Sequence, residues 1–299
     1  MLETHYLKKE HGYILIREWA PVESPLGVFH IFHGMMEHSG MYHEWAIKLT
    51  QLNWVVIAHD HPGSGLSIDR QMARDTATKS SHNQLINDAL NVHDWIQHKY
   101  PLLNIVRYGH SMGAFLALTM PDEPRAQGII LTGLKYEPQL KLRIQKMILS
   151  LGCMLFGDLS PAHLAHQITF NGGHVYRDQK DNPNDFNWVS RNPIVLNKYI
   201  SDLHCGNIVS WGYFYMVNQL LINMHGPLSI NNTNRILIMS GENDPLSFGG
   251  KQLGPLINKL EHLSIEMHHE IIPGAHHKIE GDDNENIAIN LIKAFITKQ

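Results

Sequence analysis

The sequence predicts an α/β fold in which a mostly parallel central sheet carries helices on both faces. Short apolar runs with strand character alternate with segments of helical periodicity near both ends of the chain, a pattern typical of parallel sheets. Between about residues 135 and 227 this alternation stops. We therefore predict one core made of residues 1–134 and 228–299. Residues 135–227 form an inserted, mainly helical cap, here called the cap segment.

The first half of the chain contains the clearest strand signals. Trp54–Ala58 is a continuous apolar run, as expected for a strand buried on both faces. The other predicted strands of this half are Tyr13–Trp19, Val28–Phe32, Ile105–Tyr108 and Gly128–Leu131. Helical spacing follows in Tyr42–Leu52, Ser81–Tyr100 and Met112–Met120. Pro101 and Pro121 end the last two helices, because proline cannot continue helical hydrogen bonding.

The cap segment contains two apolar stretches separated by a polar one. In Leu140–Phe156 helical spacing gathers six apolar residues on one face, which are Ile144, Met147, Ile148, Leu151, Met154 and Leu155. Ile208–Met224 is rich in aromatic residues and methionine, whereas the polar Asn171–Asn187 predicts a loop. The alternation resumes with strands Ile236–Met239 and Met267–Ile272, and with helices Lys251–Leu260 and Ile287–Ile296.

Composition argues against several classes of function. Lys and Arg number 24 and Asp and Glu 28, so the net charge is −4 with His neutral. No basic stripe is present, and we expect no nucleic-acid partner. Cys153 and Cys205 lack a zinc-type spacing, and neither a metal nor a cofactor is predicted. The polar N-terminus lacks the apolar core of a signal peptide, and we expect a cytoplasmic protein. The oligomeric state is not predicted.

A candidate nucleophile lies in Gly109-His110-Ser111-Met112-Gly113. A predicted strand enters this motif and a predicted helix leaves it, which is the context of a nucleophilic serine on a sharp turn. The flanking glycines make room for closely packed backbone, and the helix N-terminus favours developing negative charge. The pattern alone is short and occurs by chance, but with both flanks in place it predicts Ser111 as a nucleophile.

A serine nucleophile needs a base and an acid that orients the base, and here the acid precedes the histidine in the chain. Asp244 follows the predicted strand Ile236–Met239, at the strand end where open α/β sheets place functional groups. Glu242 is the rival acid and stands closer to the strand. Asp244 precedes Pro245, which suits a fixed loop, so we predict Asp244 as the acid.

The candidate bases are His276 and His277, which follow the last predicted strand. Adjacent residues cannot both face Ser111, and the spacing alone does not choose between them. His268 and His269 lie inside that strand and are less able to reach the end of the sheet, while His110 is too close to Ser111 in sequence.

The carbonyl oxygen of a substrate needs hydrogen-bond donors as it becomes negatively charged. The stretch from Phe32 to Ser39 follows an early strand, and the small Gly34 lets the backbone approach a substrate there. We predict the backbone N–H groups of Met35 and Met112 as the oxyanion donors.

Four motifs in chain order carry a resemblance to a known family. They are His33-Gly34-Met35-Met36-Glu37-His38-Ser39-Gly40-Met41-Tyr42, Gly109-His110-Ser111-Met112-Gly113, Gly241-Glu242-Asn243-Asp244-Pro245 and Pro273-Gly274-Ala275-His276-His277. Together they resemble the monoacylglycerol lipase and lysophospholipase group of α/β hydrolases, a serine aminopeptidase S33-type domain. The resemblance runs over nearly the whole core, from about Tyr13 to Phe295, and weakly through the cap segment. It implies the α/β-hydrolase fold.

The family pattern at the last motif reads Pro-Gly-Ala-Arg-His-Glu. The resemblance places the catalytic histidine at His277 and puts His276 at the arginine position. Lys278 replaces the family's glutamate, which reverses the charge next to the base. Pro62 and Ser64 also depart from the family, which has Arg and His at these positions, so substrate preference is less certain than activity.

The resemblance implies a serine hydrolase that cleaves carboxylic esters of single-chain lipids, either lysophospholipids or monoacylglycerols. An acyl-enzyme would form on Ser111, with Asp244 orienting His277. The apolar stretches of the cap segment suit a cover over an acyl chain. Four cap cations suit transient contact with a phosphate head group or a membrane surface, and they are Lys135, Lys141, Arg143 and Lys146. General carboxylesterase, thioesterase or aminopeptidase activity stays open, as does a non-catalytic binding protein.

Overall fold

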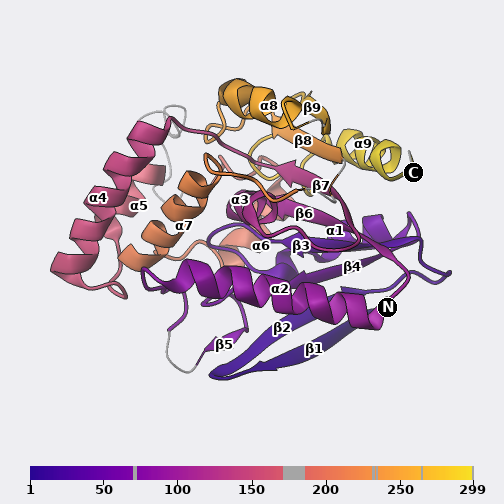
Figure 1. The fold of residues 1–299 in the computed structure, drawn as a ribbon, viewed down its shortest axis with the longest axis horizontal. Coiled ribbons are helices and arrows are strands. Elements are labelled where there is room, and N and C mark those ends of the chain that lie inside the picture. The colour runs from indigo at the N-terminus through magenta and orange to yellow at the C-terminus, as the bar shows by residue number, and fades with distance from the viewer. Residues whose placement is uncertain (70–72, 171–185, 231–232, 234, 264, 298–299) are drawn as a thin grey trace.

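The chain is described by a computed structural model, which covers residues 1–299 except 70–72, 171–185, 231–232, 234, 264 and 298–299. The described strands form one nine-stranded sheet in the order β1-β2-β4-β3-β6-β7-β8-β9, with β5 paired to β2. The pairs that involve β2 are antiparallel, and the pairs from β4 to β9 are parallel. The predicted mostly parallel α/β sheet is therefore confirmed (Figure 1).

The elements have the following bounds. The strands are β1 (Leu2–Lys9), β2 (Gly12–Trp19), β3 (Gly27–Phe32), β4 (Trp54–His59), β5 (Ile68–Asp69), β6 (Asn104–His110), β7 (Ala126–Thr132), β8 (Arg235–Gly241) and β9 (Glu266–Ile272). The helices are α1 (His43–Thr50), α2 (Ser81–Lys99), α3 (Met112–Thr119), α4 (Gln139–Phe156), α5 (His163–Phe170), α6 (Pro193–Ser201), α7 (Trp211–Asn223), α8 (Gly254–Glu261) and α9 (Glu285–Thr297). Two short 3-10 helices are η1 (Ser39–Tyr42) and η2 (Lys251–Leu253).

The sequence does not predict β1 or β5, nor the short helices α5 and α6. β1 pairs only with β2 at the edge of the sheet, and most of its side chains are exposed or half-buried, so it lacks the apolar pattern of a buried strand. The loop predicted over Asn171–Asn187 lies almost wholly outside the described residues.

Helices cover both faces of the sheet (Figure 1). Side chains of α1 and α9, such as Trp45 and Ile292, are buried in one cluster with residues of the central strands. Side chains of α2, α3 and α8 pack in the clusters on the other face. Four described helices, α4 to α7, occur in the cap segment between β7 and β8. No described helix is long and apolar enough to span a membrane.

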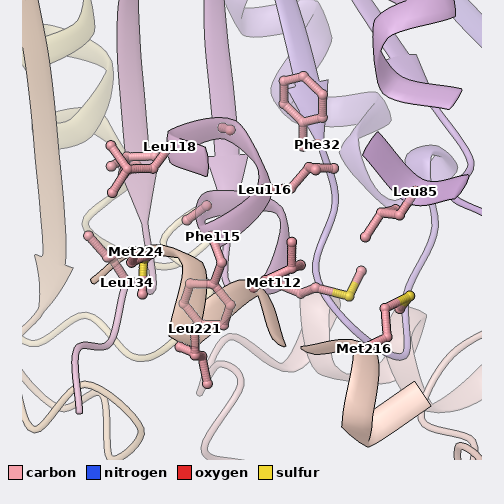
Figure 2. Close-up of a cluster of buried hydrophobic side chains, with 14 of the residues drawn as sticks. Phe32, Leu85, Met112, Phe115, Leu116, Leu118, Leu134, Met216, Leu221 and Met224 are labelled. Carbon is pink, nitrogen blue, oxygen red and sulfur yellow. The ribbon is translucent and has the colours of Figure 1, made fainter. Parts of the chain in front are cut away.

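Helix α3 is buried on all sides, as expected for a helix that is apolar around its whole circumference. The side chains of Met112 and Phe115 share one buried cluster with Met216 and Leu221 of α7 (Figure 2). Helix α7 therefore packs onto the helix that follows the candidate nucleophile. This packing holds the start of α3 in place from the side of the cap segment.

Helix α4 corrects one expectation. Its six-residue apolar face is not turned toward the rest of the protein, because each of these side chains is between 50% and 72% exposed. Contact with α7 is made by the opposite side of α4, where Gly152 packs so closely on Trp211 that an added Cβ would lie 2.2 Å from its ring. The composition of this face had suggested that it covers an acyl chain bound near the serine. The structure shows that it faces solvent instead.

Five histidines of the described core have no exposed surface, namely His30, His33, His59, His61 and His93. Burial disfavours the charged imidazolium, and it lowers the pKa of His33 to about 4 and that of His93 to about 3. The pKa values of the other three also lie well below the ordinary value of 6.5 for the same reason. All five rings are therefore neutral in the folded protein near neutral pH.

These histidines make the fold sensitive to acid. Below pH 6.5 the unfolded chain takes up protons that the folded protein does not, so we expect the free energy of unfolding to fall as the pH is lowered. Each such histidine contributes about 1.4 kcal/mol per pH unit until its folded pKa is reached. Urea denaturation at pH 7.5, 6.5, 5.5 and 5.0 measures the free energy of unfolding. The variant His93→Leu should take up one proton fewer on unfolding, so the slope of this free energy against pH should fall by up to about 1.4 kcal/mol per pH unit. A free energy of unfolding that stays constant from pH 7 to 5 would contradict this account.

Candidate active site

The candidate nucleophile Ser111 occupies the turn between β6 and α3. Its backbone has φ 52° and ψ −118°, a region that non-glycine residues rarely adopt. The conformation is held because the Ser111 N–H donates to the carbonyl of Thr132 on β7 at 2.9 Å, while the Ser111 carbonyl accepts from Ala114 in α3. The strained turn places the serine at the carboxyl end of the sheet.

The two glycines of the motif allow this turn to pack. A Cβ at Gly109 would lie 2.4 Å from the carbonyl oxygen of Gly113, and a Cβ at Gly113 would lie 2.0 Å from that of Phe32. Both distances are well inside van der Waals contact, so no other residue fits at either position without moving backbone. The expectation that these glycines make room for closely packed backbone therefore agrees with the geometry.

Asp244 and His277 come together from the loops that follow β8 and β9. The Nδ1 atom of His277 lies 3.0 Å from Oδ2 of Asp244, and both residues are buried. Burial by itself would raise the pKa of Asp244, but His277 and the hydrogen bonds that this carboxylate accepts hold its pKa below the ordinary value. The ionised carboxylate can therefore orient the imidazole.

The other candidates for acid and base have different partners. The backbone N–H of His276 donates to Asp282 at 2.8 Å, and its Nδ1 lies 3.5 Å from the same carboxylate. Glu242 accepts the Gly274 N–H at 2.8 Å. In β9 the His269 ring pairs with Ser240, and His268 lies 3.4 Å from Glu270.

Ser111 and His277 line the same cavity. Its lining residues are Gly34, Met35, Met36, Glu37, His110, Ser111, Phe170, Trp188, Val189, Tyr199, Leu246, His277 and Lys278. Met35 is thus at the cavity, and Met112 is the first residue of α3, where helix N–H groups have no partner within the helix. The structure therefore brings the predicted nucleophile, base, acid and two oxyanion donors into one part of the protein. Ser111, His277 and Met35 line the cavity, Asp244 contacts His277, and Met112 follows Ser111.

A buried ion pair between Glu37 and Lys278 stands beside these residues, and the sequence does not predict it. The Lys278 ammonium lies 2.5 Å from Oε2 of Glu37 and 4.0 Å from the centre of the Tyr42 ring. The other carboxylate oxygen accepts the Gly34 N–H and the Tyr42 hydroxyl, both at 2.6 Å. Burial alone would raise the pKa of Glu37, but Lys278 holds it far below the ordinary value. The one sequence signal is the lysine that replaces the family's glutamate next to His277.

A second buried carboxylate, Glu280, lies at the ends of β6 and β7, next to the nucleophile turn. It accepts hydrogen bonds from the hydroxyl groups of Tyr108 and Thr132. The Nδ1 atom of His110 lies 3.0 Å from the same threonine hydroxyl. Burial lowers the pKa of His110 to about 4, so this imidazole is neutral. His110 is thus committed to a structural hydrogen bond, although it borders the cavity.

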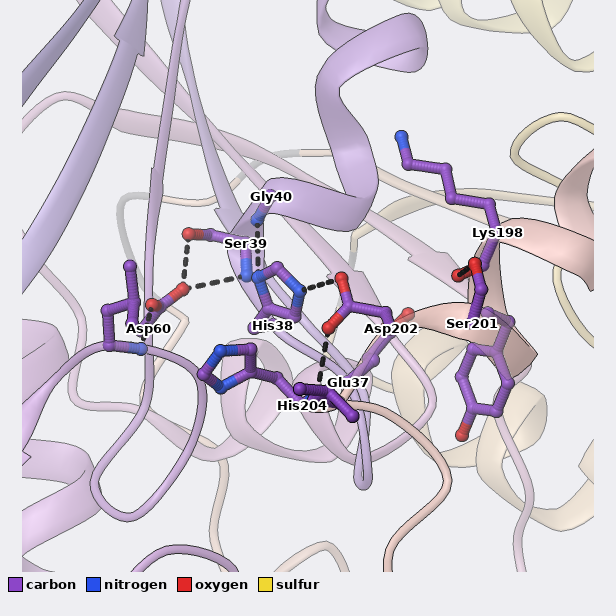
Figure 3. A network of polar contacts seen from close by, with 12 residues as sticks. Glu37, His38, Ser39, Gly40, Asp60, Lys198, Ser201, Asp202 and His204 are labelled. Atoms are coloured by element: carbon purple, nitrogen blue, oxygen red, sulfur yellow. Dashed lines mark hydrogen bonds and ion pairs between the residues drawn. The ribbon is translucent and has the colours of Figure 1, made fainter.

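The cap segment contacts the loop that follows β3. Figure 3 shows His38 between Gly40 and Asp202, with its Nε2 atom 3.0 Å from Oδ2 of Asp202. These two residues and Cys205 place donor atoms within 4.8 Å of one another, the spacing of a metal site. Because the Gly40 N–H donates to Nδ1 of His38, the ring proton lies on Nε2, which cannot then bind a metal ion. The cluster therefore fits a polar contact between cap and core better than a metal site.

The chain is similar in sequence and in fold to several known proteins. The profile of the family described as "Serine aminopeptidase, S33" matches residues 23–284. Human monoglyceride lipase is 36% identical over 121 residues, which is 40% of this chain and 38% of that protein. The chain thus spans well under two thirds of the human relative's length. Monoacylglycerol lipase of Mycolicibacterium smegmatis is 24% identical and covers 93% of this chain and 90% of its own length. A solved structure named "Lipase (Open form)" superposes with a TM-score of 0.83 at 21% identity, covering 100% of this chain and 99% of its own.

The two neighbouring histidines provide a test of the base. We expect His277→Ala to lower the rate of fluorophosphonate labelling of Ser111 by about 10⁴-fold or more, because the proton acceptor is lost. His276→Ala should leave the rate within about threefold, since its ring is held at Asp282. Labelling is followed by fluorescence after gel electrophoresis, with circular dichroism as the control for folding. Equal, mild losses in both variants would refute the choice of His277.

Proposed function

Because the chain belongs to the serine aminopeptidase S33 family of α/β hydrolases, we propose that it is a carboxylic ester hydrolase with Ser111 as its nucleophile. The observation that carries the proposal is that Ser111 and His277 line one cavity, while Asp244 holds the far side of the imidazole at 3.0 Å. Acid, base and nucleophile in this order and arrangement form a catalytic triad.

The reaction begins with proton transfer from the Ser111 hydroxyl to Nε2 of His277, while Oγ attacks the ester carbonyl carbon. The carbonyl oxygen becomes an oxyanion that accepts hydrogen bonds from the N–H groups of Met35 and Met112. As the carbon–oxygen bond to the alcohol breaks, His277 returns the proton to the leaving alcohol. An acyl-enzyme on Ser111 remains.

Water completes the cycle by the same route. His277 takes a proton from the water, the resulting hydroxide attacks the acyl carbon, and the carboxylic acid leaves as the proton returns to Ser111. Asp244 stabilises the imidazolium in both steps and keeps the ring in the orientation that its 3.0 Å contact defines. This sequence needs no metal or organic cofactor.

The charges at the cavity favour an uncharged substrate. The described lining contains one carboxylate, Glu37, and one ammonium, Lys278, and these two neutralise each other. Much of the remaining lining is apolar, including Met36, Phe170 and Trp188. We therefore propose a single-chain lipid ester with a neutral head group, a monoacylglycerol, in preference to a lysophospholipid. The names of the human and mycobacterial relatives support the same choice.

The same ion pair argues against the peptidase activity that the family's description suggests. An aminopeptidase recognises the free ammonium of its substrate, which requires a carboxylate with room for a new partner. The Glu37 carboxylate already accepts from Lys278, Tyr42 and Gly34. An ester of a neutral alcohol makes no such demand on the site.

A substrate panel tests the proposal. We expect kcat/KM for a monoacylglycerol to exceed that for a lysophosphatidic acid of equal chain length by about tenfold or more, because an added phosphate finds no free cation in the described lining of the cavity. Aminoacyl amides should be hydrolysed more slowly still. Free fatty acid release measures the two lipids, and Ser111→Ala is the control for background hydrolysis. Full activity in Ser111→Ala would disprove the role of Ser111, and a preference for the amides would disprove the substrate class.

We propose, further, that the outer face of the cap segment contacts membranes transiently. Helix α5 of the same segment also exposes apolar side chains, Leu164 and Ile168, which are 60% and 69% exposed. Large exposed apolar patches of this kind mark sites of interaction with proteins or membranes. A single-chain lipid substrate resides in membranes and micelles, so contact through this face would bring the enzyme to its substrate.

Vesicle binding tests the membrane contact. The double variant Met147→Ser, Met154→Ser removes two of the most exposed apolar side chains of α4, and we expect its partition onto phosphatidylcholine vesicles to fall by about tenfold. Leu102→Ser is the matched control, because Leu102 is 92% exposed but lies outside the cap segment. Sedimentation with vesicles measures the partition. Equal binding by the double variant and the control would exclude this face as the contact.

A further inference from the structure

Three buried imidazoles form a hydrogen-bonded chain at the carboxyl ends of β3 and β4. Nε2 of His30 lies 3.1 Å from Nδ1 of His59, and Nε2 of His59 lies 3.2 Å from Nδ1 of His61. Nε2 of His61 lies 3.2 Å from the backbone carbonyl oxygen of His33. The chain thus runs from the interior of the sheet to the first residue of the loop that contains Met35. The mechanism above uses none of these histidines.

The carbonyl at the end of the chain determines the tautomer of every ring. A carbonyl oxygen only accepts, so Nε2 of His61 carries a proton. Burial lowers the pKa of His61 and of His59 well below the ordinary value, so both rings are neutral and each Nδ1 is an acceptor. His59 and His30 must then donate from Nε2. All three rings are Nε2–H tautomers, and all three hydrogen bonds point toward His33.

The ring of His33 has the opposite tautomer. The backbone N–H of His61 donates to its Nε2 at 3.0 Å, so the proton lies on Nδ1. That Nδ1–H donates to the carbonyl oxygen of Gly34 at 2.8 Å. Two successive carbonyl groups, those of His33 and Gly34, are therefore each held by an imidazole N–H.

Peptide planarity converts these bonds into a direction for the Met35 N–H. The described part of the protein, which includes residues 33–35, has no cis peptide bonds, and in a trans peptide the C=O and N–H groups point in opposite directions. The His33 carbonyl faces His61, and the Gly34 N–H of the same peptide faces Glu37 at 2.6 Å. The Gly34 carbonyl faces His33, so the Met35 N–H points away from that ring. Met35 also lines the cavity that holds Ser111.

We propose that His61 is a positioning residue, which with His33 aims the Met35 N–H at the substrate oxygen and is itself oriented by the chain from His59 and His30. This inference rests on the proposed function, since it assigns Met35 as an oxyanion donor. His61 touches no substrate atom. It acts by fixing the loop backbone through two bonds, one to the carbonyl and one to the ring of His33.

Two substitutions at one position separate this role from general packing. The amide nitrogen of Gln reaches the position of Nε2, so His61→Gln keeps the bond to the His33 carbonyl, whereas the shorter Asn reaches only the position of Nδ1. Loss of a whole oxyanion donor lowers kcat by about 10²–10³-fold. We expect His61→Asn to lower kcat on a soluble ester by about tenfold or more with KM changed by less than about twofold, and His61→Gln to recover kcat to within about threefold. His93→Gln, a buried histidine outside the chain, is the control.

Thermal unfolding of each variant shows whether a loss of kcat merely follows a loss of stability. Equal loss of kcat in the Asn and Gln variants, or a rise in KM with kcat unchanged, would overturn the positioning role.

The tautomers are measured without reference to activity. Ring-¹⁵N-labelled histidine gives distinct nitrogen shifts for the two neutral tautomers, and single substitutions assign the signals among the 22 histidines. We expect His30, His59 and His61 as Nε2–H and His33 as Nδ1–H at pH 7. An Nδ1–H tautomer or a charged ring at His61 would overturn this inference while leaving the proposed function intact. Wild-type protein that shows these tautomers but neither hydrolyses esters nor reacts with a fluorophosphonate would overturn the proposed function instead.

Discussion

The close packing of the turn between β6 and α3 is the constraint on which the site depends. Ser111 has a positive φ, and the glycines on either side leave no room even for a Cβ. Such a turn persists only if the surrounding structure holds both of its ends. The strand end is held by β3 and β7, and α3 is buried on all sides under α7 and the sheet. The apolar packing of a whole face of the protein thus stabilises the conformation of one serine.

Around this turn, buried charges are compensated by hydrogen bonds. The Glu37 carboxylate accepts from Lys278, Tyr42 and the Gly34 N–H, so it links the residue after His277 to the loop that contains Met35. Glu280 similarly accepts from Tyr108 and Thr132 on β6 and β7. Both bonds reach the same oxygen of Glu280, and the other oxygen is buried, has no hydrogen-bond partner among the described residues and lies 3.7 Å from Nδ1 of His110. A buried carboxylate that lost one of its donors would retain the cost of burial. These hydrogen bonds connect the loops of the site to one another and to the ends of β6 and β7.

The cap segment has two sides with different physical roles. Its inner side closes onto the core through apolar packing of α7 and through polar contacts such as that of Tyr199, whose hydroxyl donates to the Met36 carbonyl at 3.0 Å. Met36 has a φ of 59°, and Gly206 donates to the same carbonyl. Its outer side exposes the apolar face of α4. One insertion therefore holds the loop beside Met35 and also presents a surface to the surroundings.

The sequence by itself determined the order of the buried core strands and of the helices between them, because this order depends on residues close together in the chain. It also indicated the nucleophile turn and the order of serine, aspartate and histidine. Tertiary structure decided what depends on distant partners. Periodicity marks an apolar face on α4 but cannot tell that the face meets solvent. His276 and His277 have the same local pattern, and only the resemblance had distinguished them. In the folded protein they also differ in their partners, since His276 lies near Asp282 and His277 contacts Asp244. Lys278 meets Glu37 across 241 positions, a pairing that the folded sheet creates by bringing two strand ends together.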